Sequence, residues 1–266
     1  MKISVIVATY NRIDALSLVL QSLETQSDPN FEVLIADDGS RPDTTAFVND
    51  FRQQSCLKLT HVWQEDAGFR LARIRNLATQ QASGEYLIYL DGDCMVQPGF
   101  VAAHRRLAQP HTMVTGSRIL LEQALTQQLC AGGQWDWPAF RQQALHYRWQ
   151  GQMNKCLPLF VHLPDHPWRR YPKFVWRRIK GCNMAAWRED VLRVGGFDEG
   201  LEGWGHEDAD FVFRLHEAGV GRKSGSWATE VLHLWHKMAD KESAEKNAAT
   251  VRAKILAKQK RWGINQ

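Results

Sequence analysis

The stretch YLIYLDGD, residues Tyr86–Asp93, indicates how this chain folds. Its first five residues are apolar or aromatic without alternation, which is typical of a strand buried on both faces of a sheet. That strand runs directly into two carboxylates that flank a glycine. Three comparable runs precede it along the chain: Ile3–Ala8, Phe31–Ala36 and Leu57–Trp63. The sequence therefore predicts a sheet of buried strands in its first half.

Helical segments separate these strands. Apolar residues recur at helical spacing from Leu16 to Leu23 and from Leu71 to Ala78, and a further helix is predicted over Asp43–Gln54. Three arginines occupy the other face of the third helix: Arg70, Arg73 and Arg75. Strands that alternate with helices predict an α/β fold with a mostly parallel sheet and helices on both faces.

Polar clusters follow three of these strands: Thr9–Arg12, Asp37–Ser40 and Asp91–Asp93. Ligands bind at the carboxyl ends of strands in such sheets, so this coincidence predicts a ligand site. The last cluster, Asp-Gly-Asp, brings two hard oxygen donors together with room for a bulky partner. That arrangement suits Mg²⁺ or Mn²⁺ held together with the phosphates of a nucleotide. An ordinary turn is the alternative, since Asp and Gly both favour turns.

The first two clusters offer groups for a nucleotide. Tyr10 provides a ring for stacking and Arg12 a charge for phosphate, although Asn11 could simply cap a helix. The Asp37-Asp38 pair could accept hydrogen bonds from a ribose or a base edge, or form a turn before a helix capped by Ser40. No GxGxxG follows the first strand and no GxxxxGK[ST] occurs, which excludes a dinucleotide fingerprint and a P-loop.

From Leu129 to Lys180 the regular pattern stops. Tryptophan and arginine are interspersed there: Trp135, Trp137, Trp149, Trp168 and Trp176 with Arg141, Arg148, Arg169, Arg170, Arg177 and Arg178. We expect irregular, mobile structure that lines a cleft. It could bind an anionic acceptor or rest on an anionic membrane surface. A partly buried core insertion is the alternative, because tryptophans are usually packed.

The densest group of functional candidates is Gly203–Asp210, which follows a Gly-Gly-Phe-Asp-Glu run. Glu207, Asp208 and Asp210 place three carboxylates within four residues, and their repulsion in a partly dry site raises at least one pKa. Such a carboxylate can act as general base toward a hydroxyl. Trp204, between two glycines, can lie flat against a sugar ring. The alternative for the carboxylates is an acidic helix start.

Two histidines, His233 and His236, follow a short apolar run near the end of the chain. One of them could complete the metal shell begun by Asp91 and Asp93. A structural role is the alternative for such a pair of histidines.

The rest of the second half regains regular signals. A short helix is predicted over Glu207–Ala218 and a charged helix over Lys241–Trp262. We expect one face of the latter to carry the apolar residues Ala248, Val251, Ile255 and Leu256. There is no internal repeat or low-complexity linker, so the two halves are expected to form one continuous fold.

The composition of the 266 residues is that of a globular protein, with 44% hydrophobic and 23% charged residues. A net charge of +4 is too small to indicate a nucleic-acid binder. No apolar run approaches the ~18 residues of a membrane span, and the first residues do not resemble a signal peptide. Five cysteines without CxxC spacing indicate reduced thiols: Cys56, Cys94, Cys130, Cys156 and Cys182. We therefore expect a soluble cytoplasmic protein.

Read together, these motifs resemble family-2 glycosyltransferases of the GT-A fold. The resemblance rests first on Val5–Arg12, Asp37–Ser40, Arg75-Asn76 and Asp91–Asp93. Asp66–Asn76 is especially similar to bacterial chondroitin-polymerase-type domains. Three later runs resemble the carboxyl-terminal part of β-1,4-galactosyltransferases: Gly181–Ala185, Gly195–Glu199 and Gly203–Asp210.

The resemblance implies a role for each matching residue. The nucleotide-binding positions are Thr9, Tyr10, Asn11, Arg12, Asp38, Arg70, Arg75 and Asp91. The DxD motif, Asp91 and Asp93, would hold Mn²⁺ or Mg²⁺, with His233 fitting the third ligand better than His236 because it ends an apolar strand. Asp208 matches the catalytic base of inverting enzymes. The sugar-binding positions are Trp204, Glu207, Asp210 and Asn183. His206 departs from the pattern, which usually has glycine there, and so leaves the donor sugar open.

The resemblance also implies an organisation and a reaction. It divides the chain into a nucleotide-sugar-binding half (1–128), an acceptor-binding half with the base (129–240) and a carboxyl-terminal helix (241–266). A hexose or N-acetylhexosamine would pass with inversion from a UDP-sugar to a hydroxyl of a bacterial surface glycan or glycolipid, with peripheral contact at the inner membrane face. A non-catalytic binding module on the same fold is the alternative, and a sugar-nucleotide pyrophosphorylase is disfavoured because Thr9–Arg12 is not a GxGxR loop.

Overall fold

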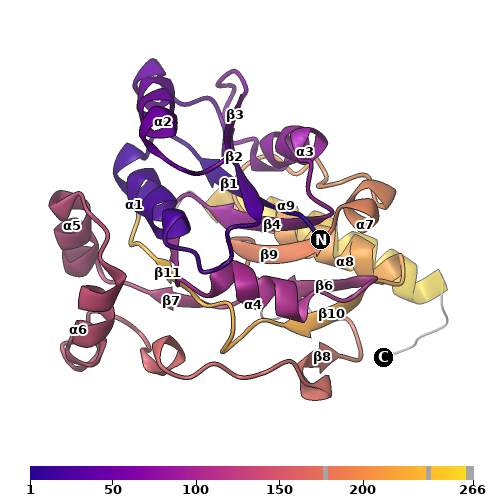
Figure 1. Ribbon diagram of the computed structural model, residues 1–266. Coiled ribbons are helices and arrows are strands. Elements are labelled where there is room, and N and C mark those ends of the chain that lie inside the picture. Colours follow the sequence, from indigo (N-terminus) through magenta and orange to yellow (C-terminus); the bar gives the residue numbers. More distant parts are fainter. Residues whose placement is uncertain (176–178, 238–240, 262–266) are drawn as a thin grey trace.

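The computed structural model describes residues 1–175, 179–237 and 241–261 (Figure 1). Its strands are β1 Ile3–Thr9, β2 Phe31–Asp37, β3 Leu59–Trp63, β4 Tyr86–Asp91, β5 Cys94–Val96, β6 Thr112–Thr115, β7 Arg118–Leu120, β8 Arg170–Tyr171, β9 Asn183–Trp187, β10 Gly221–Ser224 and β11 Val231–His233. Its α-helices are α1 Ile13–Glu24, α2 Pro42–Gln54, α3 Leu71–Gln81, α4 Phe100–Leu107, α5 Gln123–Gly132, α6 Trp137–Trp149, α7 Arg188–Arg193, α8 Glu207–Glu217 and α9 Lys241–Arg261. None of these helices has the length and apolar character needed to cross a lipid bilayer.

The large sheet has eight strands in the order β3-β2-β1-β4-β9-β6-β10-β8, with β3 at one end and β8 at the other (Figure 1). The first four of these strands are parallel, and β9 runs antiparallel between β4 and β6. This arrangement confirms the predicted mostly parallel α/β architecture. Strand β9 comes from the second half of the chain, so both halves share one sheet. The division at residues 128 and 129 stays a prediction.

Two hydrophobic clusters cover the two faces of this sheet. Val5 and Val7 of β1 belong to the cluster that includes residues of α1, α2, α4, α5 and α6, whereas Ile6 belongs to the cluster that includes residues of α3, α7 and α8. Successive side chains of a strand point to opposite faces, so an unbroken apolar run is needed where both faces are covered. This explains why the run Ile3–Ala8 lacks the alternation of a half-exposed strand.

A smaller sheet lies beside the large one and has the strand order β5-β11-β7. Strand β5 follows the Asp-Gly-Asp turn directly, and β11 pairs with it antiparallel, so that His233 lies opposite Cys94. This pairing brings the end of the second half of the chain to the carboxyl end of β4.

The prediction of irregular structure over Leu129–Lys180 is wrong for its first part. Helix α6 occupies Trp137–Trp149, begins after Asp136, whose carboxylate accepts a hydrogen bond from Ala139 N, and buries Phe140, Ala144 and Tyr147. These residues recur at helical spacing, but polar residues and an early proline obscure the pattern. From there to Arg169 the segment has two short 3₁₀ turns. Trp176, Arg177 and Arg178 lie outside the described residues.

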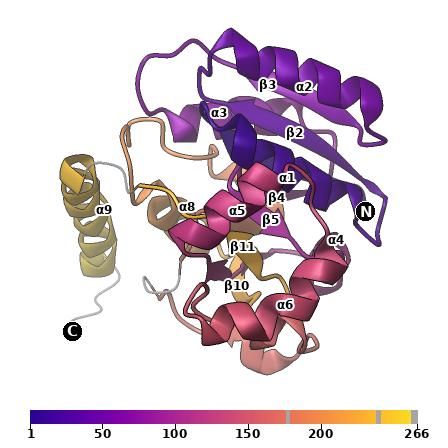
Figure 2. The same ribbon diagram turned by 90° about the vertical axis from the view of Figure 1, so that its left-hand side faces the viewer.

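Helix α9 lies against α8, at the side of the molecule (Figure 2). Val251 and Ile255 are buried there with Leu201 and Phe213, as expected for its apolar face. Leu256 is exposed, so its predicted place on that face is wrong. The contact ties the carboxyl-terminal helix to the segment that precedes α8.

Candidate active site

The Asp-Gly-Asp turn lies where β4 ends beside β1. Gly92 N donates to the carbonyl of Ala8 at 2.6 Å, and a Cβ on Gly92 would stand 2.7 Å from that oxygen. Only glycine therefore allows the turn to lie this close to β1. The turn therefore places Asp91 and Asp93 at the carboxyl end of β4, beside the end of β1.

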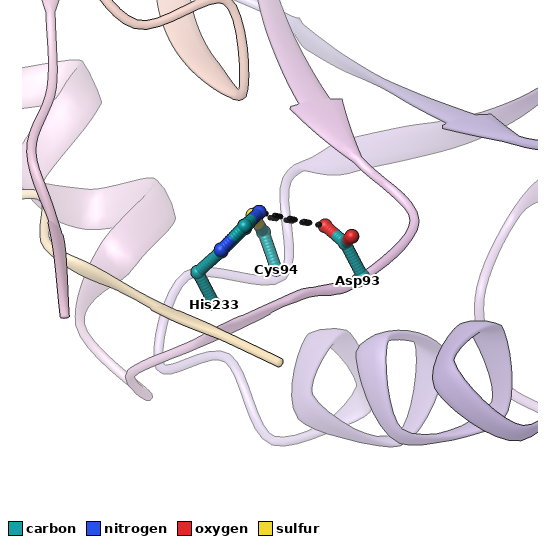
Figure 3. Close-up of side chains that lie close together, drawn as sticks. All are labelled: Asp93, Cys94 and His233. Carbon is teal, nitrogen blue, oxygen red and sulfur yellow. Dashed lines mark hydrogen bonds and ion pairs between the residues drawn. The ribbon is translucent and has the colours of Figure 1, made fainter. Parts of the chain in front are cut away.

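Asp93 faces two histidines. Its Oδ1 lies 3.5 Å from His233 Nε2 and its Oδ2 lies 3.6 Å from His236 Nε2 (Figure 3 shows the first pair). Burial lowers the pKa of His233, so its ring favours the neutral form in which a nitrogen can bind a metal. Carboxylate and imidazole donors at these separations fit a divalent cation. The sequence did not distinguish the role of His236 from a structural one, and both rings reach Asp93.

Arg75 joins the metal candidates to the acidic helix. Its guanidinium donates to Asp91 Oδ1 at 2.7 Å, to Glu207 Oε1 at 3.4 Å and to the carbonyl of Gly181 at 3.2 Å. The side chain is 1% exposed. The expected place of Arg75 on a polar helix face is therefore wrong, and its guanidinium contacts two carboxylates; its nucleotide-binding role stays a prediction. Burial lowers the pKa of Arg75, but the charges of Asp91 and Glu207 outweigh it and raise that pKa.

Two adjacent carboxylates at the start of α8 have different surroundings. Glu207 is buried, and this burial, with the charge of Asp208, raises its pKa to about 7 although Arg75 opposes the shift. Asp208 is half-buried, and its Oδ2 accepts a hydrogen bond from Gly181 N at 2.8 Å. A carboxylate oxygen has a second lone pair. Asp208 can therefore accept a proton from a hydroxyl group.

The residues that are expected to bind the nucleoside lie at the carboxyl ends of β1 and β2. Asp38 is almost buried, and its carboxylate accepts hydrogen bonds from Gln64 Nε2 and from the backbone N of Arg70. Burial raises the pKa of Asp38. Tyr10 is half-exposed, and its hydroxyl donates to Asp66 Oδ2 at 3.0 Å. The ring is thus available for stacking beside Asp38, and both roles stay predictions.

The other residues of the first cluster stabilise this end of the sheet. Asn11 has a positive φ of 49°, its N donates to Ser40 Oγ at 2.8 Å and its Oδ1 accepts from Arg41 N at 2.9 Å. Arg12 forms an ion pair with Asp14 at 3.0 Å. Thr9 Oγ1 is buried without a hydrogen-bond partner among the described residues. The Asn11 contacts therefore join the segment after β1 to the segment after β2, where a nucleotide is expected to bind.

Two predicted sugar-binding residues are turned away from the site. Asp210 is fully buried, and its carboxylate accepts from Arg214 Nε at 2.7 Å and Lys254 Nζ at 2.8 Å. It lies about 200° around α8 from Asp208, at about 100° per residue. Asn183 is also fully buried, and its amide donates to the carbonyls of Ser117 and Thr229. The structure gives both side chains a structural position instead.

The Gly-Trp-Gly-His loop before α8 packs on α9. Gly203 and Gly205 have positive φ values of 78° and 104°, and a Cβ on Gly203 would stand 2.5 Å from Ser243 Cβ. Trp204 is 40% exposed, so its ring remains accessible to a ligand. His206 has a φ of 72° at the residue before α8, which explains why glycine is favoured there.

Helix α9 adds residues that sequence reasoning missed. Asn247 Nδ2 donates to the carbonyls of Glu202 at 3.0 Å and Gly205 at 3.1 Å, and Lys254 pairs with Asp198 at 2.6 Å as well as with Asp210. The sequence of a charged helix does not indicate which of its polar residues make such contacts, because their partners are distant in sequence. The helix thereby holds the loop that carries Trp204.

Two regions of the chain match two different family models. Residues 4–128 match the model of glycosyl transferase family 2, and residues 169–237 match the model described as the N-terminal domain of galactosyltransferase. The two regions are those from which the resemblance was inferred.

Several similar proteins are glycosyltransferases or polysaccharide synthases by name. The chain is 30% identical to the validoxylamine A glucosyltransferase of Streptomyces hygroscopicus subsp. limoneus, over 87% of this chain and 52% of the relative. It is 28% identical to the chondroitin synthase of Escherichia coli, over 82% of this chain and 32% of the relative. The chain thus spans about half the length, or less, of these relatives.

The fold itself recurs in solved structures. The crystal structure of GalNAc-T7 with UDP, GalNAc and Mn²⁺ superposes with a TM-score of 0.62 at 17% identity, over 95% of this chain and 48% of that one. Such low identity shows the fold alone, and it confirms the predicted fold class. Residues 4–128 therefore match glycosyltransferase family 2 and residues 169–237 match a galactosyltransferase-type model, and both regions lie on one GT-A fold.

Proposed function

We propose that this chain is an inverting, metal-dependent glycosyltransferase that moves a hexose or N-acetylhexosamine from a UDP-sugar to a hydroxyl group of a glycan or glycolipid. The observation that carries the proposal is the bridge through Arg75, whose guanidinium contacts both Asp91 at the end of β4 and Glu207 at the start of α8. This bridge supports placing the metal-binding candidates in one site with the acidic start of α8, where the base candidate Asp208 follows Glu207. The names of the relatives and the UDP and Mn²⁺ of the solved structure support this class.

At the donor end, Asp91, Asp93 and His233 would hold Mn²⁺ or Mg²⁺, with His236 beside them. When bound, such an ion supplies positive charge that offsets the charge of a leaving diphosphate. Tyr10 and Asp38 would orient the nucleoside. Arg75 keeps one oxygen of Asp91 engaged at 2.7 Å, which orients its carboxylate toward the same side as Asp93.

At the acceptor end, Asp208 would remove the proton of the acceptor hydroxyl. The hydroxyl oxygen forms a bond to C1 of the sugar while the bond from C1 to the diphosphate breaks, and the proton passes to the Asp208 carboxylate. Attack from the face opposite the diphosphate inverts the anomeric centre. Gly181 N holds Oδ2 of Asp208 at 2.8 Å, and the half-exposed ring of Trp204 is available to pack on a sugar.

A donor screen tests the reaction class. UDP release would be measured with UDP-Glc, UDP-Gal, UDP-GlcNAc and UDP-GalNAc, each in Mn²⁺ and in EDTA. We expect metal-dependent release from one donor. Release that is equal in EDTA would contradict the metal dependence, and absence of UDP binding would refute the nucleotide site and favour the binding-module alternative.

Variants test the assigned roles. Asp208→Asn should retain UDP binding and lose transfer by about 100-fold or more, the range of general-base contributions. Asp93→Asn should weaken Mn²⁺-dependent UDP binding instead. Asp43→Asn, exposed in the first turn of α2, is the control for removal of a carboxylate. Unchanged transfer in Asp208→Asn would refute its role, and an α-linked product from a UDP-α-sugar, detected by NMR, would refute inversion.

The acceptor is proposed to be a bacterial surface glycolipid that contacts α6. Trp149 and Leu145 lie one turn apart on this helix and are 82% and 60% exposed. Such exposed apolar side chains beside Arg148 suit the boundary of an anionic lipid surface. Flotation with vesicles of anionic lipid should carry the wild-type chain and less of a Trp149→Ala variant. Equal flotation with neutral vesicles would refute the dependence on anionic lipid, and no flotation with either kind would refute the lipid contact.

A further inference from the structure

The thiol of Cys94 faces the metal-binding candidates, and the proposed transfer reaction does not use it. Cys94 is fully buried and is the first residue of β5, directly after Asp93. In the antiparallel pair of β5 and β11, Cys94 lies opposite His233. Side chains of directly opposed residues emerge on the same face. Strand pairing therefore brings the sulfur and the imidazole together, as Figure 3 shows.

Two of the three distances among these side chains match those of a tetrahedral site. Cys94 Sγ lies 3.4 Å from Asp93 Oδ1, and His233 Nε2 lies 3.5 Å from the same oxygen. All three ligand atoms lie within 4.8 Å of one another. Zinc bonds of about 2.0 Å to oxygen or nitrogen and 2.3 Å to sulfur place tetrahedral ligands about 3.3–3.6 Å apart. Oxygen ligands of an octahedral Mg²⁺, at about 2.1 Å, are only about 3.0 Å apart.

We propose that Asp93, Cys94 and His233 form a preorganised site for a thiophilic divalent cation of the zinc class, with the fourth position open. Sulfur, imidazole and carboxylate together favour zinc or cobalt, whereas Mg²⁺ prefers oxygen ligands alone. As the metal–sulfur bond forms, the thiol releases its proton to solvent. His236, whose Nε2 lies 3.6 Å from the other oxygen of Asp93, stands beside the open position.

The site has a consequence for the donor metal, which rests on the proposed function. Asp93 and His233 belong to both ligand sets, so a bound zinc ion excludes Mn²⁺ or Mg²⁺ from the same place. Zinc then competes with the activating ion, and Cys94 determines how strongly it does so. The ligand set itself does not depend on the reaction and can be tested without a nucleotide.

Cobalt is the probe, because a thiolate ligand gives Co²⁺ a charge-transfer absorption band that oxygen and nitrogen ligands do not. The wild-type chain, free of nucleotide and reducing agent, is titrated with Co²⁺ and then with Zn²⁺, which displaces it. Cys94→Ser is compared with Cys156→Ser, a matched control because Cys156 is also a buried free thiol but lies outside the cluster. Folding of each variant is checked by urea unfolding.

We expect the band in wild type and in Cys156→Ser, and its loss in Cys94→Ser. Zinc should bind Cys94→Ser more than about 10-fold more weakly, the least that removal of even an outer partner of a metal site commonly costs. Mn²⁺ affinity should change by less than about threefold, because manganese gains little from sulfur.

Absence of the band in wild type would overturn the proposal whether or not the variants fold. A band that persists in Cys94→Ser and disappears in Cys182→Ser would also overturn it, because the Cys182 thiol contacts that of Cys94. Mn²⁺-dependent UDP binding, measured on the same samples, reports on the proposed function separately. A cobalt band without UDP binding would support the zinc-class site and contradict the transferase.

Discussion

Substitution of Glu207 by glutamine should stabilise the protein at alkaline pH. The side chain is only 10% exposed, and its pKa is raised from 4.5 to about 7, by burial first and then by the charge of Asp208. A change of this size corresponds to about 3 kcal/mol, at about 1.36 kcal/mol per pH unit. Ionisation of the Glu207 carboxyl therefore lowers the free energy of unfolding by this amount, and the neutral amide of glutamine avoids the loss.

The sign of the pH dependence follows from the raised pKa. Because the folded state binds the proton more tightly, the stabilising effect of protonation is fully present below pH 4.5 and is lost as the pH rises through about 7. Glu207→Gln should thus unfold with a free energy about 3 kcal/mol larger than wild type at pH 8, and less than about 1 kcal/mol larger at pH 5.

Urea unfolding at pH 5 and pH 8, in EDTA so that no divalent ion binds, measures this difference. Glu24→Gln, at the exposed end of α1, is the control for loss of one carboxylate on a helix. A Glu207→Gln variant that is less stable than wild type at pH 8 would refute the reasoning. A difference that is the same at both pH values would refute it as well.

Three further substitutions test the packing of the site by urea unfolding. Arg75→Met leaves two carboxylates without their cation and should cost about 3–5 kcal/mol, whereas a loss below about 1 kcal/mol would contradict the buried ion pairs. Gly92→Ala places a Cβ 2.7 Å from the carbonyl oxygen of Ala8 and should lower the free energy of unfolding by about 1–3 kcal/mol. It should also weaken Mn²⁺ binding, measured by calorimetry. An unchanged Mn²⁺ affinity would contradict the close turn. Gly203→Ala has a φ of 78° and meets Ser243, so it should cost about 1–2 kcal/mol and speed proteolysis of α9; an unchanged cleavage rate would show that the loop does not hold the helix.

The first half of the fold could be predicted because its signals are local. An unbroken apolar run such as Ile3–Ala8 can only be a strand covered on both faces, and β1 occupies Ile3–Thr9. Helix α6 was missed because Phe140 and Ala144, its buried residues, are separated by polar ones and flanked by Trp137 and Pro138. Burial of only one narrow stripe leaves a weak periodic signal.

Only those parts of the candidate site that lie within short sequence motifs could be predicted. Asp91 and Asp93 could be placed because a strand end precedes them, and Asp208 because the acidic cluster starts a helix. The surroundings of each side chain depend on elements distant in sequence. Asp210 belongs to the same cluster, but its buried carboxylate forms ion pairs with Arg214 and with Lys254 of α9.

The sequence by itself determined the α/β class, the strand ends that bear carboxylates and the match of residues 4–128 to the family-2 glycosyltransferase model. Only the tertiary structure decided that Arg75 is buried between two carboxylates and that Cys94 faces His233. The physical reason is that hydrophobic periodicity and turn chemistry act over a few neighbouring residues. Charge pairing and strand register are decided by which distant segments the folded core brings into contact.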